Sequence, residues 1–193
     1  MAQAVLKQPS HMTVEEFLAW DDGTDTRYEL VGGEVFAMAP PSVAHADIIV
    51  NLAIDIGTKL RPPCRASAEV GIRSPSRGDT FYQADLAIGC SPRRPGDRYL
   101  GEPVVIIEVL SPGTANFDRG SKIPDYRAIP SVREIALVSS TEIKAETWHR
   151  TASGWEVMDV VGDKAVLRFA SIDVEIPLGT ACEGVVFETE KTG

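Results

Sequence analysis

The 193-residue sequence lacks the long apolar run that a membrane-spanning helix needs. Such a helix requires roughly 20 consecutive apolar residues, and no stretch of the chain approaches that length. The start, MAQAVLKQPSHMT, also lacks the apolar segment of a secretory signal. We therefore expect no membrane partner and a cytoplasmic location.

Cysteine is scarce, which excludes a disulfide-rich scaffold. Cys64, Cys90 and Cys182 are isolated and show no paired spacing of the kind that binds zinc. Any bridge between two of them would leave the third unpaired. In a cytoplasmic protein we expect all three to be reduced thiols.

Positive charge is also in short supply, with 19 Lys and Arg against 28 Asp and Glu, a net charge of −9. This balance counts against a broad nucleic-acid-binding surface but leaves a local groove open. Several arginines gather in turn-rich stretches between residues 61 and 98. Two interpretations are open for them: solvated loop arginines, or a rim that grips phosphate.

What is present is an ordinary globular composition, with 44% hydrophobic and 24% charged residues. The length fits one domain. No internal repeat or low-complexity segment divides the chain. We expect an N-terminal extension at 1–12, a single domain at 13–185 and a polar C-terminal tail at 186–193.

Apolar periodicity and turn residues predict a mixed sheet with helices, an α/β or α+β class. The two expected helices of the first part are a short one capped by Thr13 that ends near Trp20, and a long one from Ser42 to about Leu60. Gly32-Gly33 predicts a hairpin. The remaining expected elements are strands at 28–31, 34–38, 66–72, 80–88, 103–110, 134–139, 143–150, 156–161 and 165–169, and a helix within 118–129.

The expected strands at 80–88 and 103–110 are apolar on both sides. Each carries one carboxylate, Asp85 in the first and Glu108 in the second. Strict alternation would place Tyr82, Ala84, Leu86 and Ile88 on the face opposite Asp85. If the strands are neighbours, the two carboxylates lie side by side and cannot both stay charged without a cation. Mg²⁺ or Mn²⁺ would satisfy both. The alternative, equally open, is that each carboxylate pairs with an arginine or caps a loop.

The helix after the second strand adds a cation. Ser121 is a candidate cap that would put Pro124 in the first helical turn, whereas a helix begun earlier would absorb this proline as a kink. Lys122 shares a stripe with Tyr126, and with Asp118 if the helix extends back. Its ammonium would orient an attacking water or stabilise an oxyanion on phosphorus. The alternative is a lysine that reaches solvent at a helix end.

These residues resemble a known family. The segments RYELVGGEVFAMAPPSVAHADI, YQADLAIG and VVIIEVLSPGTANFDRGSKIPDYRAIPSVREIALV are similar to the Uma-two family of endonucleases, within the PD-(D/E)XK restriction-endonuclease-like superfamily. The resemblance covers most of the chain, from about Thr13 to about Gly184. Its most specific part runs from Glu108 to Tyr126.

The resemblance implies a restriction-endonuclease-like fold, with a mixed central sheet flanked by helices and additional hairpins. It implies hydrolysis of phosphodiester bonds in nucleic acid, with DNA as the expected partner, by a homodimer. Asp85 and Glu108 would be the ligands of Mg²⁺ or Mn²⁺, and both would be catalytic together with Lys122. Glu29 would be a further catalytic residue that approaches the metal from the hairpin as an accessory ligand, unless it is a surface carboxylate on an edge strand.

Two departures from the family pattern bear on activity. Gln83-Ala84-Asp85 stands where many relatives have Arg-Pro-Asp, which alters strand geometry more than chemistry. The family's Glu-x-Lys reads Glu108-Val109-Leu110 here, so the strand has no lysine. Lys122 would be its stand-in.

Three further residues are candidates for outer-shell or substrate contacts. His45 lies in the first turns of the long helix, where a hydrogen-bonded structural histidine is the alternative. Gln83 shares a face with Asp85. Ser111, with Thr114, follows the strand of Glu108 and alternatively only organises the turn.

Two rival functions remain open. A catalytically inactive protein of the same fold, acting as an interaction or regulatory module, fits the acidic charge and Leu110. A glycoside hydrolase would use the same carboxylate pair, but the low aromatic content, 7%, offers few sugar platforms.

Overall fold

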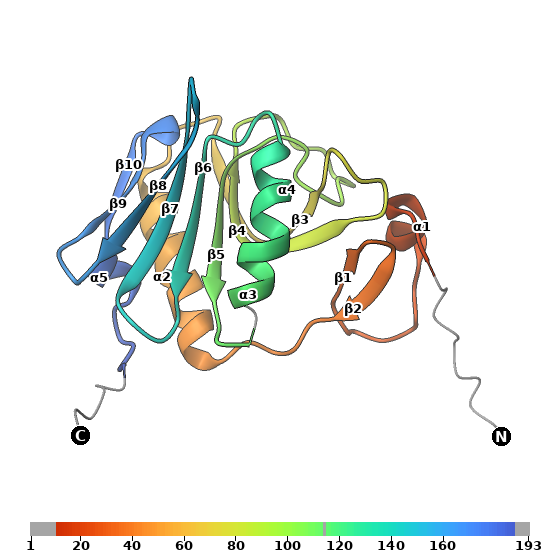
Figure 1. Cartoon of the computed structure of the whole chain (residues 1–193), viewed down its shortest axis with the longest axis horizontal. Coiled ribbons are helices and arrows are strands. Elements are labelled where there is room, and N and C mark those ends of the chain that lie inside the picture. The colour runs from red at the N-terminus through yellow and green to blue at the C-terminus, as the bar shows by residue number, and fades with distance from the viewer. Residues whose placement is uncertain (1–10, 114, 188–193) are drawn as a thin grey trace.

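The computed structural model describes residues 11–113 and 115–187, and they form a mixed sheet with helices on both faces (Figure 1). In these residues eight strands make one sheet in the spatial order β2-β1-β4-β5-β6-β7-β8, with β3 paired to β4 off this path. The strands are β1 (Tyr28–Val31), β2 (Glu34–Ala37), β3 (Arg65–Arg73), β4 (Phe81–Gly89), β5 (Pro103–Leu110), β6 (Glu134–Ser139), β7 (Lys144–Thr151) and β8 (Gly154–Val161). A separate pair consists of β9 (Val166–Phe169) and β10 (Val174–Pro177). The predicted fold class is confirmed.

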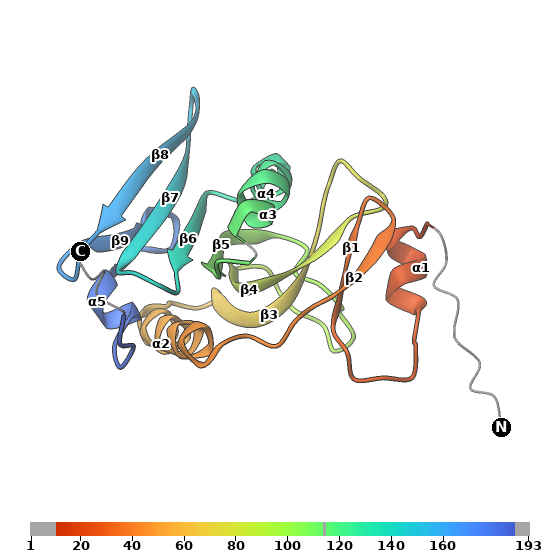
Figure 2. The same ribbon diagram turned by 60° about the horizontal axis from the view of Figure 1, so that its bottom comes forward.

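Helices cover both faces of the large sheet (Figure 2). One face carries α2 (Val43–Lys59), and the other carries the link between β5 and β6. This link consists of α3 (Ala115–Phe117), a π-helical turn (Asp118–Lys122) and α4 (Ile123–Ala128). The other helical elements are α1 (Val14–Ala19), a 3₁₀ turn (Ala170–Ile172) and α5 (Leu178–Ala181). No helix in the described ranges is long and apolar enough to cross a bilayer.

Each face of the sheet has its own apolar core. Ile48, Leu52 and Ile56 of α2 are fully buried against one face. On the other face, Tyr126 of α4 is fully buried against a cluster that includes Ile106 of β5. Burying each such side chain contributes about 1.5–3 kcal/mol, so both helices are fixed on the sheet that carries the predicted site.

The ends of the two predicted helices in the first part lie where the sequence places them. The Thr13 side chain and Glu16 form the capping box of α1. The Ser42 hydroxyl accepts a hydrogen bond from the His45 backbone N–H at 3.2 Å, which starts α2. This cap sets His45 in the first turn of the helix.

The side chains of β4 change faces at Asp85. Ala84 packs in the cluster under α4, whereas Leu86 packs in the cluster under α2. The prediction that these two side chains share a face is therefore wrong. The reason lies in β3, where Glu69, the residue that would oppose Asp85, has a φ of +49° and interrupts the ladder.

The link between β5 and β6 is helical from Ala115 onward, so a helix start at Ser121 is wrong. Ser121 lies within the π-helical turn, in which the Ile123 N–H donates to the Asp118 carbonyl. Pro124, which has no N–H, stands in the first turn of α4 as expected. The wider π turn accommodates a proline in a helix that begins earlier.

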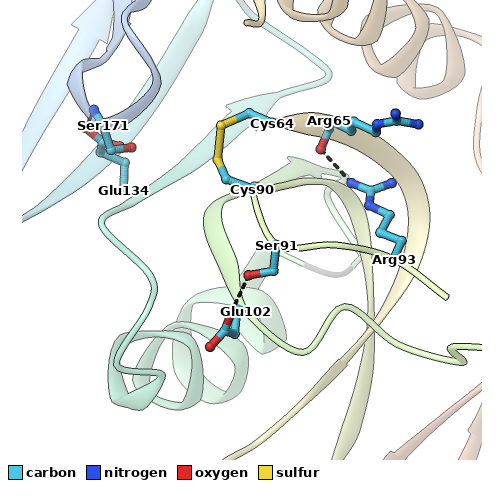
Figure 3. Close-up of a disulfide and its surroundings, with 8 residues drawn as sticks. All are labelled: Cys64, Arg65, Cys90, Ser91, Arg93, Glu102, Glu134 and Ser171. Atoms are coloured by element: carbon cyan, nitrogen blue, oxygen red, sulfur yellow. Dashed lines mark hydrogen bonds between the residues drawn. A yellow bond between two sulfur atoms is a disulfide. The ribbon is translucent and has the colours of Figure 1, made fainter. Parts of the chain in front are cut away.

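Cys64 and Cys90 form a disulfide at the end of the β3–β4 ladder (Figure 3). The strand register pairs Arg65 with Gly89, so the next residues outward face each other. The expectation of three reduced thiols is wrong, and Cys182 is the free cysteine. Disulfides are rare in reducing compartments. The cysteines therefore no longer support a cytoplasmic location, which stays a prediction.

The arginines between residues 61 and 98 mostly serve local structure. Arg73 forms an ion pair with Glu15 at 2.7 Å. Arg93 donates to the Arg65 carbonyl at 2.7 Å (Figure 3). These contacts favour loop organisation over a phosphate-gripping rim.

The domain limits 13–185 stay a prediction. Residues 1–10 of the expected extension, residues 188–193 of the expected tail and Thr114 lie outside the described ranges.

Thiol counting tests the disulfide. We expect the denatured, unreduced protein to expose one titratable thiol, that of Cys182. The bond links cysteines 26 residues apart, so its reduction should lower the free energy of unfolding by about 3 kcal/mol, measured by urea unfolding with and without reductant. The double variant Cys64→Ser, Cys90→Ser is the control and should not respond to reductant. Three thiols in the unreduced protein would contradict the pairing.

Candidate active site

The site lies where β1 and β5 part along one edge of β4. Near the start of β4, Phe81 pairs with Leu30 of β1; farther on, Leu86 pairs with Ile107 of β5. Between these points two side chains complete the edge. Glu29 accepts from the Gln83 N–H at 2.9 Å, and Glu108 accepts from the Asp85 N–H at 3.2 Å.

Asp85 and Glu108 are neighbours, as the strand argument predicts. The β4–β5 register, extended by one residue from Leu86 and Ile107, sets them opposite each other. Asp85 Oδ2 accepts from the Val109 N–H at 2.7 Å, so each carboxylate binds the backbone of the other strand. Glu108 is 2% exposed, whereas the Asp85 side chain keeps 17% of its surface open.

Lys122 reaches the same place from the helical link. Its Nζ lies 2.9 Å from Glu29 Oε1, 3.3 Å from Glu108 Oε1 and 3.5 Å from Asp118 Oδ1. It also donates to the Gln83 carbonyl at 3.4 Å. Lys122 is 5% exposed, so the alternative of a lysine that reaches solvent is wrong.

Tyr126 and Asp118 join the site without having been assigned to it from the sequence. The Tyr126 hydroxyl donates to Glu108 Oε1 at 2.6 Å, and Asp118 pairs with Lys122 one turn away. The signal was the four-residue spacing of Asp118, Lys122 and Tyr126, which puts all three on one stripe. We name the carboxylates Glu29, Asp85, Glu108 and Asp118 the acid cluster.

Negative charge exceeds positive charge in the acid cluster, because four carboxylates face one ammonium and one imidazole. Burial raises the pKa of Glu108 to about 8; Lys122 opposes this shift, and the charges of Asp85 and Asp118 add to it. Burial alone would lower the pKa of Lys122, but the carboxylates of Glu108, Glu29 and Asp118 outweigh it and raise that pKa. Lys122 is therefore an ammonium at neutral pH.

His45 holds Asp85 from the first turn of α2. Its Nε2 lies 3.3 Å from Asp85 Oδ2. Burial lowers the pKa of His45, but the hydrogen bond and charge of Asp85 outweigh burial and raise it. Its Nδ1 is buried and has no hydrogen-bond partner among the described residues. The imidazole is therefore fixed beside Asp85 from the first turn of α2.

The other two predicted outer-shell residues have different positions. Gln83 contributes through its backbone, by the N–H to Glu29 and the carbonyl to Lys122. Ser111 lies just beyond β5, and its carbonyl accepts from the Ala115 N–H at 3.0 Å. A contact of Ser111 with the substrate or with the site's outer shell stays a prediction.

The acid cluster fits a hard divalent ion through two carboxylates. Within residues 11–113 and 115–187, no three His, Cys, Asp or Glu side chains form a ready-made metal site. Mg²⁺ needs only one or two carboxylates, because it retains several waters. Asp85 and Glu108 supply that number. Burial is the main cause of the raised pKa of Glu108, and the charge of Asp85 adds to it, so the two carboxylates interact. The residues present therefore fit the ion.

The pKa of Glu108 predicts how stability depends on pH. Since the folded-state pKa is raised from 4.5 to about 8, the stabilisation is complete below pH 4.5 and is lost as pH rises through 8. In the metal-free protein, Glu108→Gln should remove a slope of up to about 1.4 kcal/mol per pH unit between these values. Urea unfolding at several pH values measures it. Glu156→Gln, on the exposed side of β8, is the control; parallel pH profiles for wild type and Glu108→Gln would contradict the assignment.

Removing the ammonium should be costly. Lys122→Met leaves three buried carboxylates without their cation, and we expect a loss of about 3–5 kcal/mol in the free energy of unfolding at pH 8. The loss should shrink at pH 5, where Glu108 can take up a proton. Lys164→Met, in an exposed turn, is the control. A loss below about 1 kcal/mol at pH 8 would show that Lys122 does not hold the acid cluster together.

Comparison with known proteins gives concordant matches. Residues 14–178 match the family model Uma2, described as "Putative restriction endonuclease". "Uncharacterized protein slr1290" of Synechocystis sp. (strain ATCC 27184 / PCC 6803 / Kazusa) is 26% identical over 180 residues, which cover 91% of this chain and 94% of that protein. "Uncharacterized protein sll1609" of the same organism is 23% identical over 170 residues, covering 84% and 95%.

A solved structure shares the fold. The crystal structure of a "putative nuclease belonging to DUF820" from Anabaena variabilis ATCC 29413 matches with a TM-score of 0.73 at 18% identity. The match covers 89% of this chain and 97% of that chain. The two proteins therefore share a fold. Because the family model spans most of the sequence, the chain belongs to the Uma2 family.

Proposed function

We propose that this chain is a Mg²⁺- or Mn²⁺-dependent endonuclease that hydrolyses phosphodiester bonds of nucleic acid, with DNA as its substrate. The observation that carries the proposal is the convergence of Asp85, Glu108 and Lys122, with the Lys122 ammonium 3.3 Å from Glu108 Oε1. The description of the Uma2 family model, "Putative restriction endonuclease", supports it. The fold shared with the "putative nuclease" from Anabaena variabilis supports it as well.

Asp85 and Glu108 are the proposed metal ligands. A bound Mg²⁺ or Mn²⁺ would polarise the phosphate and lower the pKa of an attacking water. Asp85 is the more exposed of the two carboxylates, so the open side of the site faces Asp85 and His45.

Lys122 acts as a cation in this proposal, not as a base. Its raised pKa keeps the ammonium protonated at neutral pH. A fixed positive charge beside the metal ligands stabilises negative charge that develops on a phosphate oxygen. The helical link supplies the ammonium that β5 lacks, because Leu110 stands where the family pattern has its lysine.

Glu29 is a positioning residue in this scheme. Its Oε1 accepts from the Gln83 N–H and lies 2.9 Å from Lys122 Nζ, so one oxygen ties the hairpin, β4 and the helical link together. Loss of the Glu29 side chain would free the Lys122 side chain to move, while the metal ligands Asp85 and Glu108 would keep their positions.

One observation favours a catalytically inactive module of the same fold as a second candidate. Lys122 already contacts Glu29, Glu108 and Asp118 within 3.5 Å, so three carboxylates of the acid cluster are paired without any ion. Such a module would keep the fold and bind nucleic acid or protein without hydrolysis.

The proposal includes a homodimer, which would bring one active site to each strand of double-stranded nucleic acid. The edge strand β8 supports it through exposed apolar side chains, with Val157 47%, Met158 52% and Val161 63% exposed. Dimers with two-fold symmetry are the commonest oligomers. Light scattering coupled to gel filtration measures the mass in solution.

Nuclease assays test the proposal. Wild type should cleave DNA with Mg²⁺ or Mn²⁺, and Asp85→Asn or Glu108→Gln should lower the rate by at least about 100-fold, because each removes a metal ligand. Lys122→Gln should lower it by about 10²–10³-fold, since a lost transition-state contact costs roughly that much. Glu175→Gln, exposed on β10 and away from the acid cluster, should cleave like wild type. No cleavage of single- or double-stranded DNA or RNA with either ion would overturn the proposal in favour of the inactive module.

A further inference from the structure

A pocket of about 240 Å³ lies at the carboxyl ends of the parallel strands β5 and β6. We name it the strand-end pocket. The lining residues that matter below are Leu110, Arg119, Leu137, Ser139, Thr141 and Lys144. In sheets with parallel strands and covering helices, this end is where ligands bind.

The strand-end pocket adjoins the acid cluster on the same face of the sheet. Leu137 of β6, which lines the pocket, is in register with Glu108 of β5. Leu110 follows Glu108 by two residues and packs in the same cluster under α4. Arg119 follows Asp118 directly. A strand of nucleic acid whose phosphate lies at the acid cluster would therefore have its next nucleotide at this pocket.

The pocket combines an apolar floor with a polar rim. Leu110 and Leu137 form the floor and are almost fully buried. Hydroxyls line one side, where the Ser139 and Thr141 oxygens lie 3.2 Å apart. The Lys144 side chain is 39% exposed, and its ion pair with Asp159 is loose at 4.0 Å. Its ammonium is therefore available to a phosphate.

Arg119 and Glu146 form the wall between the pocket and the helical link. The Arg119 guanidinium lies 3.7 Å from Glu146 Oε2. The Trp148 indole N–H donates to Glu146 Oε1 at 2.7 Å and fixes that carboxylate. A fixed carboxylate and nearby hydroxyls can accept and donate hydrogen bonds at the edge of a base.

The pocket has a volume of about 240 Å³ and is open to solvent, so it leaves room for a planar ring such as one nucleobase. A nucleobase offers hydrogen-bonding groups at its edge and an apolar face for the floor. Leu110 thus has a use in place of the family's lysine, because it keeps the floor apolar.

We propose that the strand-end pocket binds one base of the substrate strand, next to the phosphate at the acid cluster, with Lys144 on the adjoining backbone phosphate. The inference rests on the proposed function, since it names where the substrate of that same site is held. It adds a residue set, Leu110, Ser139 and Lys144, that determines how the strand is gripped.

Binding of a short fluorescent oligothymidylate to the full chain, without divalent metal, tests the pocket. Ser139→Leu fills the pocket and should raise the Kd at least about tenfold. Lys144→Gln should raise the Kd several-fold and lower the slope of log Kd against log salt by about 1. Thr58→Leu on the exposed side of α2 and Lys164→Gln are the matched controls and should stay within twofold of wild type. Circular dichroism and thermal unfolding confirm that each variant folds.

Abasic substitution separates a seated base from simple charge attraction. Removing one base should weaken binding to wild type at one position of the strand, and Ser139→Leu should abolish that dependence, as in a double-mutant cycle.

If Ser139→Leu and Lys144→Gln match their controls while wild type binds and cleaves, the pocket inference is overturned and the proposed function stands. If wild type shows the abasic dependence but cleaves nothing with Mg²⁺ or Mn²⁺, the inference stands and catalysis fails. A wild type that neither binds nor cleaves overturns both.

Discussion

The buried ammonium of Lys122 is the contact on which the site depends. It lies within 3.5 Å of carboxylate oxygens from the first hairpin, from β5 and from its own helical link. Burying the Glu108 carboxylate unpaired would cost several kcal/mol. The lysine therefore makes it possible for the sheet to bring its carboxylates together.

The backbone explains why the carboxylates are there at all. β1 and β5 leave a gap along the edge of β4, and the side chains of Glu29 and Glu108 accept the N–H groups exposed in it. A buried N–H without a partner is costly. The same two side chains thus complete the sheet and face the ammonium, which links the stability of the fold to the chemistry of the site.

Much of this arrangement follows from local rules. Consecutive strands pair, so Asp85 and Glu108 were expected to be neighbours, and four-residue spacing directed Lys122 toward them. The rest depends on contacts between distant segments. The disulfide needs the β3–β4 register, the change of face at Asp85 needs the left-handed Glu69, and the early start of the helical link needs a π turn. None of these has a periodic signature in the sequence.

Leu110 connects the departures from the family pattern. It stands at the β5 position where the family's Glu-x-Lys pattern would have a lysine. Lys122 instead supplies an ammonium to the same face from the helical link. The apolar side chain then serves as floor for the strand-end pocket beside the acid cluster. Lys122 thus keeps an ammonium at the site, while Leu110 keeps the floor of the adjoining pocket apolar.

We propose that Asp85 and Glu108 of the acid cluster bind a divalent cation together. The anomalous scattering of Mn²⁺ in crystals of wild type and of Glu108→Gln grown at pH 8 tests this binding. We expect an Mn²⁺ peak in contact with Asp85 and Glu108 in wild type, and its loss in the variant. A wild-type crystal saturated with Mn²⁺ that shows no peak there, with Lys122 still bound to Glu108, would contradict it.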